Sequence, residues 1–99
     1  MSSKKDLKET LDALVIAGSE GVWEDEELMV TAEAFINNSL NISETSRVLY
    51  IHRNTLMYRL DKIERETGYN LRSFSDAVVF KFISVIRTVL QQNWGEYNE

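Results

Sequence analysis

The sequence predicts an all-α domain of about five helices, with a helix-turn-helix unit at its centre. The 99 residues contain no proline and only four glycines, and these two residue types are the strongest breakers of helices. Apolar residues also recur at helical spacing in several segments. The length suits a single domain over 1–99. We expect an N-terminal helix and loop at 1–22, the helix-turn-helix domain at 24–92 and a C-terminal tail at 93–99.

The first third of the chain predicts two helices. Three leucines at helical spacing predict an amphipathic helix over 4–17, followed by a loop at 18–21. Four acids at 24–27 open a second predicted helix, which ends near Asn37, because acidic side chains favour the positive end of a helix dipole. A calcium loop needs alternating oxygen ligands and a turn glycine, so we predict a solvated first turn there and no metal site.

Two helices joined by a tight turn are predicted in the middle of the chain. Ser43 is the predicted N-cap of a short helix over 44–49, and residues 50–51 form the turn. His52 is the predicted N-cap of a longer helix, 53–66. The apolar residues at spacing i, i+4 and i+7 on its inner face are Leu56, Leu60 and Ile63.

The final helix is predicted over 74–92. Gly68 supplies the left-handed position that closes the preceding helix, and Ser73 with Asp76 has the spacing of a capping box. Its apolar side covers roughly 160°, wider than the roughly 100° stripe that one neighbour needs. The residues on this side are Val78, Val79, Phe82, Ile83, Val85, Ile86, Val89 and Leu90. Phe80 is expected to project from the opposite side.

The wide apolar side predicts a second partner for this helix. We expect a homodimer that uses the surplus surface of Phe80, Val85, Val89 and Trp94. The first predicted helix offers another interface, and it is also the alternative cover for the same surface within one chain. A dimer would suit a helix-turn-helix protein, because one recognition helix contacts only a few base pairs.

Residues 41–60 have the pattern of a helix-turn-helix. Such a unit needs a small residue in the first helix, a buried apolar residue in the turn and a second helix that is polar at its start. Ser46, Ile51 and the run Arg53-Asn54-Thr55 meet these requirements in order. The start of the second helix enters the major groove, where arginine can contact guanine and asparagine can contact adenine. The sequence therefore predicts binding to double-stranded DNA.

Nine residues are the predicted DNA contacts. They are His52, Arg53, Asn54, Thr55, Tyr58, Arg59, Ser43, Thr45 and Arg47. Arg53 and Asn54 are predicted to contact bases, with a solvated helical turn as the alternative, and Thr55 and Arg59 to contact phosphates. Packing against a neighbouring domain is the alternative for Tyr58.

The remaining predicted contacts lie at helix starts. His52 is a predicted cap or phosphate contact, since a lone histidine makes a poor metal site. Ser43, Thr45 and Arg47 are predicted to bind phosphate at the start of the short helix, and a cap alone is the alternative for Ser43.

Charge is unevenly distributed along the chain. The formal net charge is −5, yet residues 45–65 hold five basic and two acidic residues, a local charge of +3. Affinity for phosphate depends on the local patch, while the acidic remainder weakens long-range attraction. We therefore expect weak non-specific DNA binding.

Other function classes receive little support from the sequence. The chain has no cysteine, one histidine and no glycine-rich phosphate loop, which leaves only carboxylates on exposed segments for catalysis. We expect no enzyme, no cofactor, no catalytic or metal site and no small-molecule ligand. The longest apolar stretch, 77–90, contains Lys81 and Arg87 and is too short to span a bilayer. With no readable signal peptide either, we expect a cytoplasmic protein.

Several motifs within 28–90 point to a known family. They are Asn41-Ile42-Ser43-Glu44-Thr45, Ile51-His52-Arg53-Asn54-Thr55-Leu56 with Tyr58-Arg59-Leu60, then Lys62-Ile63-Glu64 and Thr67-Gly68 to Leu71. On these motifs the segment resembles the C-terminal helix-turn-helix domain of the PucR/CdaR family of transcriptional regulators. The Arg-Asn-Thr-Leu run is also similar to the DNA-binding domains of Fis and of NtrC-type activators. The resemblance implies a sequence-specific regulator that inserts the helix 53–66 into the major groove.

Two features differ from the family's pattern. Family members usually carry a large N-terminal sensory region, where this chain has one predicted helix, so no effector is predicted. Met57 stands where the pattern commonly has arginine, which removes one expected DNA contact. The alternative function is therefore a protein-interaction adaptor that keeps the fold and binds DNA weakly or not at all.

Overall fold

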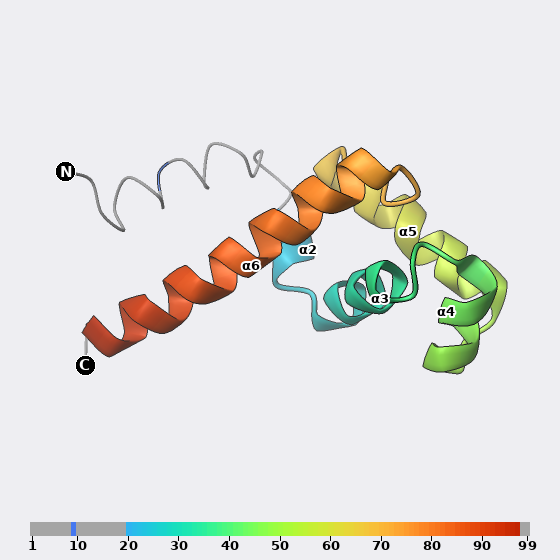
Figure 1. Cartoon of the computed structure of the whole chain (residues 1–99), viewed down its shortest axis with the longest axis horizontal. Helices are drawn as coiled ribbons and strands as arrows, with labels where there is room; N and C mark the ends of the chain where they lie inside the picture. The colour runs from blue at the N-terminus through green and yellow to red at the C-terminus, as the bar shows by residue number, and fades with distance from the viewer. Residues whose placement is uncertain (1–8, 10–19, 98–99) are drawn as a thin grey trace.

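The computed structural model describes Glu9 and residues 20–97, with side chains at Glu9 and over 21–92. This part of the chain contains five helices and no strand. The helices are α2 (Glu20–Trp23), α3 (Glu26–Asn37), α4 (Ile42–Leu49), α5 (Arg53–Thr67) and α6 (Phe74–Tyr97) (Figure 1). The predicted all-α class is confirmed. The helix predicted over 4–17 lies outside the described residues, except for Glu9.

Asp25 begins α3. Its backbone is extended, and its side chain accepts a hydrogen bond from the Leu28 N–H at 3.1 Å, which is the N-cap arrangement. Glu26 and Glu27 lie in the first turn, near the positive end of the helix dipole. The predicted helical start is confirmed. The loop predicted at 18–21 is wrong at its last two residues, which belong to α2.

Asn41, and not Ser43, is the N-cap of α4. The Asn41 side chain accepts a hydrogen bond from the Glu44 N–H at 2.7 Å, and Ile42 is already helical. Ser43 is an exposed residue inside the first turn. Serine and asparagine cap helices about equally well, so residue type alone does not decide between the two positions. The predicted Ser43 cap is wrong, because Asn41 holds the extended backbone that a cap requires.

The two ends of α5 agree with the prediction. His52 caps the start, where its Nδ1 accepts a hydrogen bond from the Asn54 N–H at 2.9 Å. Gly68 follows the last residue with a φ of 85°, and its N–H donates to the Glu64 carbonyl at 2.8 Å. This left-handed backbone is the reason a glycine ends the helix here.

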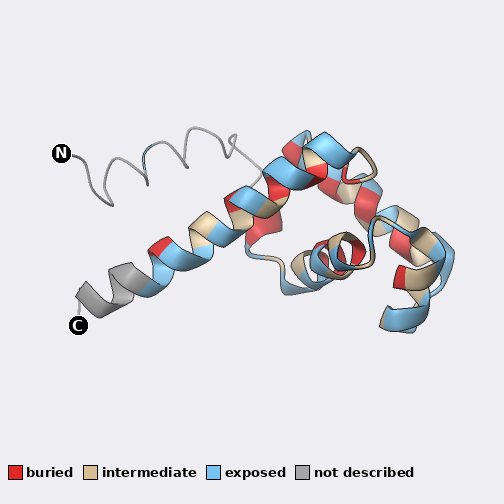
Figure 2. Cartoon of the chain, viewed as in Figure 1, coloured by how far each residue is buried: buried red, intermediate tan, exposed pale blue. Residues whose placement is uncertain are grey.

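The core lies where α3 and α5 pack together, with α2, α4 and α6 against them (Figure 2). The predicted inner face of α5 is confirmed, since Leu56, Leu60 and Ile63 are fully buried. Phe35 of α3 and Phe80 of α6 are the largest of the fully buried side chains. Burial of such large apolar side chains provides most of the free energy that fixes the orientation of α5.

Phe80 belongs to the core, contrary to the prediction that it projects from the far side of α6. It is 1% exposed, stacks on the Trp23 ring with centroids 4.5 Å apart and meets Tyr69 edge-on. Phe80, Ile83 and Leu90 therefore form the inner face of α6, and most of the predicted apolar side faces solvent. The helix is apolar on both faces, and the two aromatic partners from distant segments determine which face is buried.

The last helix also extends to Tyr97, five residues beyond its predicted end at residue 92. Among the described residues, none of the helices combines the length and the apolar composition that crossing a lipid bilayer requires.

Candidate nucleic-acid interface

α4 and α5 pack against each other as the two helices of a helix-turn-helix. Tyr50 ends α4 in the left-handed conformation with a φ of 57°, and the Ile51 N–H donates to the Ser46 carbonyl at 3.1 Å. Ile51 is half-buried and packs against the core, as predicted for the apolar turn residue. The pair lies at one end of the molecule, away from the C-terminal end of α6 (Figure 1). The turn therefore sets the start of α5 at a fixed angle to α4.

The start of α5 presents polar side chains to solvent. His52, Arg53 and Asn54 are exposed, and Thr55 is half-buried. Tyr58 lies one turn after Asn54 and is exposed too, with the Arg65 guanidinium 5.9 Å from its ring centroid. The first N–H groups of a helix carry partial positive charge. Cationic and hydrogen-bonding groups are thus gathered at a helix end that attracts anions.

α4 adds Ser43 and Arg47, which lie one turn apart. Both are exposed, and the Arg47 guanidinium pairs with the Glu44 carboxylate on the same helix. This exposed i, i+3 pair is weak and can rearrange, so it leaves the arginine available to another anion.

Tyr50 is an exposed residue that the sequence analysis missed. Its side chain is 95% exposed at the turn between α4 and α5. A non-glycine residue with positive φ is uncommon, and here it turns an aromatic side chain away from the core. Its position directly after the short helix and before His52 was the available signal. Tyr50 therefore extends the exposed surface across the turn.

Two of the nine predicted contacts lie away from this surface. Thr45 is fully buried, and its hydroxyl donates to the Asn41 carbonyl at 2.7 Å. Arg59 is only 18% exposed and points back to α3, where it donates to Thr31 Oγ1 at 3.1 Å and to Glu27 Oε2 at 3.0 Å. The structure therefore does not bring these two side chains to the exposed surface at the start of α5, because each is held inside the domain.

Comparison with known proteins identifies the unit that these helices form. Residues 28–83 match the family described as the PucR C-terminal helix-turn-helix domain. The chain belongs to this family. The matched stretch holds nearly all of α3, all of α4 and α5, and the first part of α6. The predicted resemblance is confirmed, and with it the coarse function class of a DNA-binding domain of transcriptional-regulator type.

The relatives are longer proteins. The chain is 35% identical over 86 residues to the uncharacterized protein YxkF of Bacillus subtilis, covering 84% of this chain and 27% of that protein. It is 37% identical over 68 residues to the purine catabolism regulatory protein of the same organism, covering 69% of this chain and 13% of that protein. It is 41% identical over 49 residues to the carbohydrate diacid regulator of Escherichia coli, covering 50% of this chain and 13% of that protein.

The chain therefore spans about a quarter or less of the length of these relatives. No solved structure matches it.

In this PucR-type domain, the first acidic residue of α5 is Asp61, which lies in the second half of that helix. Arg72 pairs with Asp61 at 2.7 Å and approaches Glu64 at 3.9 Å. These pairs partly neutralise the negative charge of the two carboxylates, which would otherwise repel phosphate near the recognition helix. The first two turns of α5 carry no acid at all, so α5 itself adds no repulsion of phosphate there, and Glu44 on α4 is paired with Arg47.

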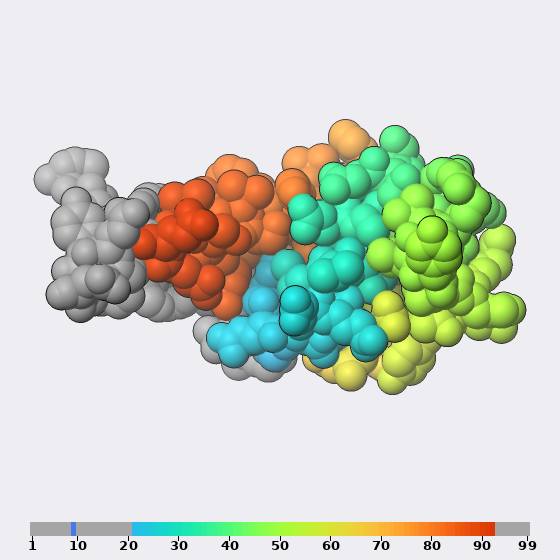
Figure 3. Space-filling model, turned by 90° about the horizontal axis from the view of Figure 1, so that it is seen from below, coloured from blue at the N-terminus to red at the C-terminus, as the bar shows by residue number. Residues whose placement is uncertain are grey.

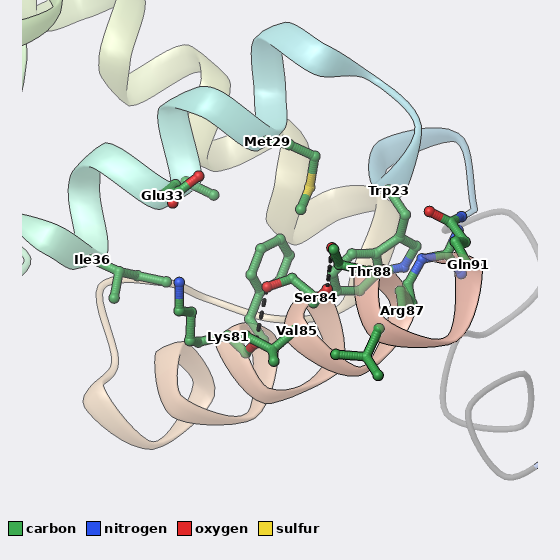
Figure 4. Close-up of a pocket in the computed structure, with 13 residues that line it drawn as sticks. Trp23, Met29, Glu33, Ile36, Lys81, Ser84, Val85, Arg87, Thr88 and Gln91 are labelled. Atoms are coloured by element: carbon green, nitrogen blue, oxygen red, sulfur yellow. Dashed lines mark hydrogen bonds between the residues drawn. The ribbon is translucent and has the colours of Figure 1, made fainter. Parts of the chain in front are cut away.

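A separate groove of about 420 Å³ lies between α3 and α6. Met29 and Ile36 line it from α3, and Lys81 and Val85 line it from α6 (Figure 4). The Ser84 and Thr88 hydroxyls donate to carbonyls of their own helix. Within the described part of the chain, no three potential metal-ligating side chains converge.

Proposed function

We propose that this domain binds a specific site in double-stranded DNA and thereby regulates transcription, with the first two turns of α5 in the major groove. One observation carries the proposal: Arg53 and Asn54 are exposed at the start of a helix whose opposite face is fully buried. A rigid helix with a polar, cationic start has the geometry that major-groove recognition requires.

Each exposed residue has a role that its chemistry supports. Arg53 would make two hydrogen bonds to guanine, and Asn54 two to adenine. His52 and Thr55 would bind the phosphates beside them, and Tyr58 would contact the strand along the groove edge. On α4 and the turn, Ser43, Arg47 and Tyr50 would bind phosphate and fix the register, because phosphate contacts position a protein without specifying sequence.

We further propose that the domain works as a homodimer in the bacterial cytoplasm. A single recognition helix covers a few base pairs, and two-fold dimers read half-sites about 34–36 Å apart. Two of the relatives are named as regulators, of purine catabolism and of carbohydrate diacids, and this supports a role in regulating transcription for the present domain. The proposal assigns no effector, operator or regulated gene.

Selection from a randomised duplex pool tests the proposal. The full chain is expected to enrich one sequence over successive rounds at low salt, and an electrophoretic mobility shift should then separate that duplex from a scrambled one. No enrichment, or equal affinity for both duplexes, would contradict sequence-specific binding.

The second candidate is a protein-interaction adaptor. Two observations favour it: the net charge of −5 and the exposed apolar residues on α6. Failure of the selection, together with a folded chain, would support this adaptor.

A further inference from the structure

The outer face of α6 exposes large apolar side chains along about four turns. Phe74, Val78, Val79, Phe82, Val85 and Val89 are between 41% and 75% exposed, and we name these six residues the outer stripe. In Figure 2, pale blue recurs along this helix between the buried positions. Most of the stripe lies on the side of α6 away from Phe80, which is buried in the core, and Val85 and Val89 also line the groove towards α3. The fold of one chain therefore leaves it without a partner among the described residues.

The spacing in the stripe is typical of a helix that pairs with another helix. Val78, Phe82, Val85 and Val89 follow one another at intervals of four, three and four residues. This is the a/d spacing of a heptad repeat, which keeps one seam of a helix facing its partner. The seam continues over about three turns of regular helix, so the pattern extends well beyond one chance contact.

The stripe carries no charge. All six members are phenylalanine or valine, while Asp76 and Arg87 point to the core side of the helix. A surface without charge has no need of a partner with complementary charge. It also meets no like-charge repulsion from its own copy, so a two-fold axis can place two stripes against each other.

The exposed area matches the small end of specific interfaces. With about 150–250 Å² for an aromatic side chain and less for valine, the six residues present on the order of 600 Å². Monomeric proteins rarely expose a contiguous apolar patch much larger than this. Two stripes would bury on the order of 1,200 Å², where specific interfaces begin.

α6 extends beyond the other described helices. α6 has 24 residues and is roughly 36 Å long. Its C-terminal part projects beyond the body that α3, α4 and α5 form (Figure 3). The proposed DNA-contacting end lies away from that part (Figure 1), so pairing through α6 keeps both recognition helices accessible.

We propose that the outer stripe of α6 is the interface of a homodimer, in which two α6 helices pair along it. The outer stripe is then the surface through which the homodimer proposed above forms. Its test is self-association without DNA, so its failure is distinct from failure of the DNA-binding proposal, which depends on site selection.

Sedimentation equilibrium of the full chain from about 1 to 100 µM measures this association directly. We expect a concentration-dependent mass that approaches twice the 11.5 kDa of one chain. Phe82→Glu should weaken the association at least about tenfold, because it places an unpaired carboxylate in an apolar seam. The side chain is 62% exposed in the monomer, so the fold should remain, as circular dichroism can verify.

Gln91→Glu is the matched control. It adds the same charge to the same helix at an exposed position about 180° around from Phe82, and it should leave the association unchanged. A mass of 11.5 kDa throughout, or equal weakening by both variants, would overturn the proposal, and the helix predicted over 4–17 or an unrelated partner would then be the occupant of the stripe.

Disulfide trapping gives an independent result. The chain has no cysteine, so Phe82→Cys introduces the sole thiol, near the centre of the stripe and close to the two-fold axis in either helix direction. Oxidation should yield a covalent dimer for this variant and far less for Gln91→Cys. Equal yields from the two variants would contradict the pairing.

Discussion

At the scale of the residue, two arginines on α5 have contrasting surroundings. Arg53 is exposed at the first position of the helix. Arg59, six residues later, is held by Thr31 and Glu27 of α3. Thr31 itself donates to the Glu27 carbonyl at 2.8 Å, so the guanidinium completes a network between two helices. The first arginine is therefore available for DNA, and the second fixes the helix that presents it.

Arg53→Ala should weaken binding to the selected duplex by about 1–3 kcal/mol, because it removes one bidentate base contact. The preference at a single base-pair position should relax at the same time. Fluorescence anisotropy with the selected duplex and its single-base variants measures both effects. Lys62→Ala removes an equal charge from the second half of the same helix, about 180° around from Arg53, and serves as the control. Equal losses on selected and scrambled DNA would exclude a base contact for Arg53.

Arg59→Ala should lower the free energy of unfolding by roughly 1–2 kcal/mol, since it removes hydrogen bonds from a charged group that is mostly buried. Urea denaturation measures this loss. Arg47→Ala, which breaks the exposed pair with Glu44, should change stability by less than about 0.5 kcal/mol. If the two variants unfold at the same urea concentration, the α3–α5 network contributes nothing measurable.

Met57→Arg should tighten DNA binding. Met57 is half-buried one turn after Arg53, where a longer cationic side chain can reach a phosphate. The slope of log affinity against log salt should steepen by about 0.9 for one more neutralised phosphate. An unchanged slope would show that this position does not approach the DNA backbone.

At the scale of the element, two substitutions at the start of α4 test which residue caps this helix. Asn41→Ala should destabilise the domain by about 1 kcal/mol, because the Glu44 N–H loses its acceptor. Ser43→Ala should change stability by less than about 0.5 kcal/mol, since Ser43 is exposed and helical. Thermal unfolding followed by circular dichroism compares the two, and a larger loss for Ser43→Ala would contradict the cap.

The helices differ in how far their sequences predict them. α5 has one apolar face and distinct signals at both ends, His52 and Gly68, so its bounds and inner face follow from periodicity and capping. α6 is apolar on both faces, and its pattern does not show which face the core takes. Phe80 faces inward because Trp23, 57 residues earlier, stacks on it, and no local pattern contains that contact.

At the scale of the whole molecule, the candidate site depends on contacts between distant segments. The residues at the start of α5 were predictable, because a cap and a polar first turn are local features. The position of Arg59 was not, since its partners lie 28 and 32 residues away. Thr45 likewise has the residue type of a phosphate contact, yet it packs inside because α4 turns that side toward α5.

The arrangement separates two surfaces on one small domain. The DNA-contacting surface lies at the end formed by α4 and the start of α5, and the outer stripe lies on α6 (Figure 1). A charge placed in the stripe should therefore alter self-association and leave the DNA contacts of each copy intact.

Titration of the isotope-labelled chain with the selected duplex, followed by amide chemical shifts, tests the central claim most directly. We predict that the largest changes fall on residues 52–55 and 58 of α5, with Ser43, Arg47 and Tyr50 beside them. The scrambled duplex should produce smaller changes at the same positions. Changes centred on the groove between α3 and α6, or no changes at the start of α5, would contradict DNA recognition by this helix.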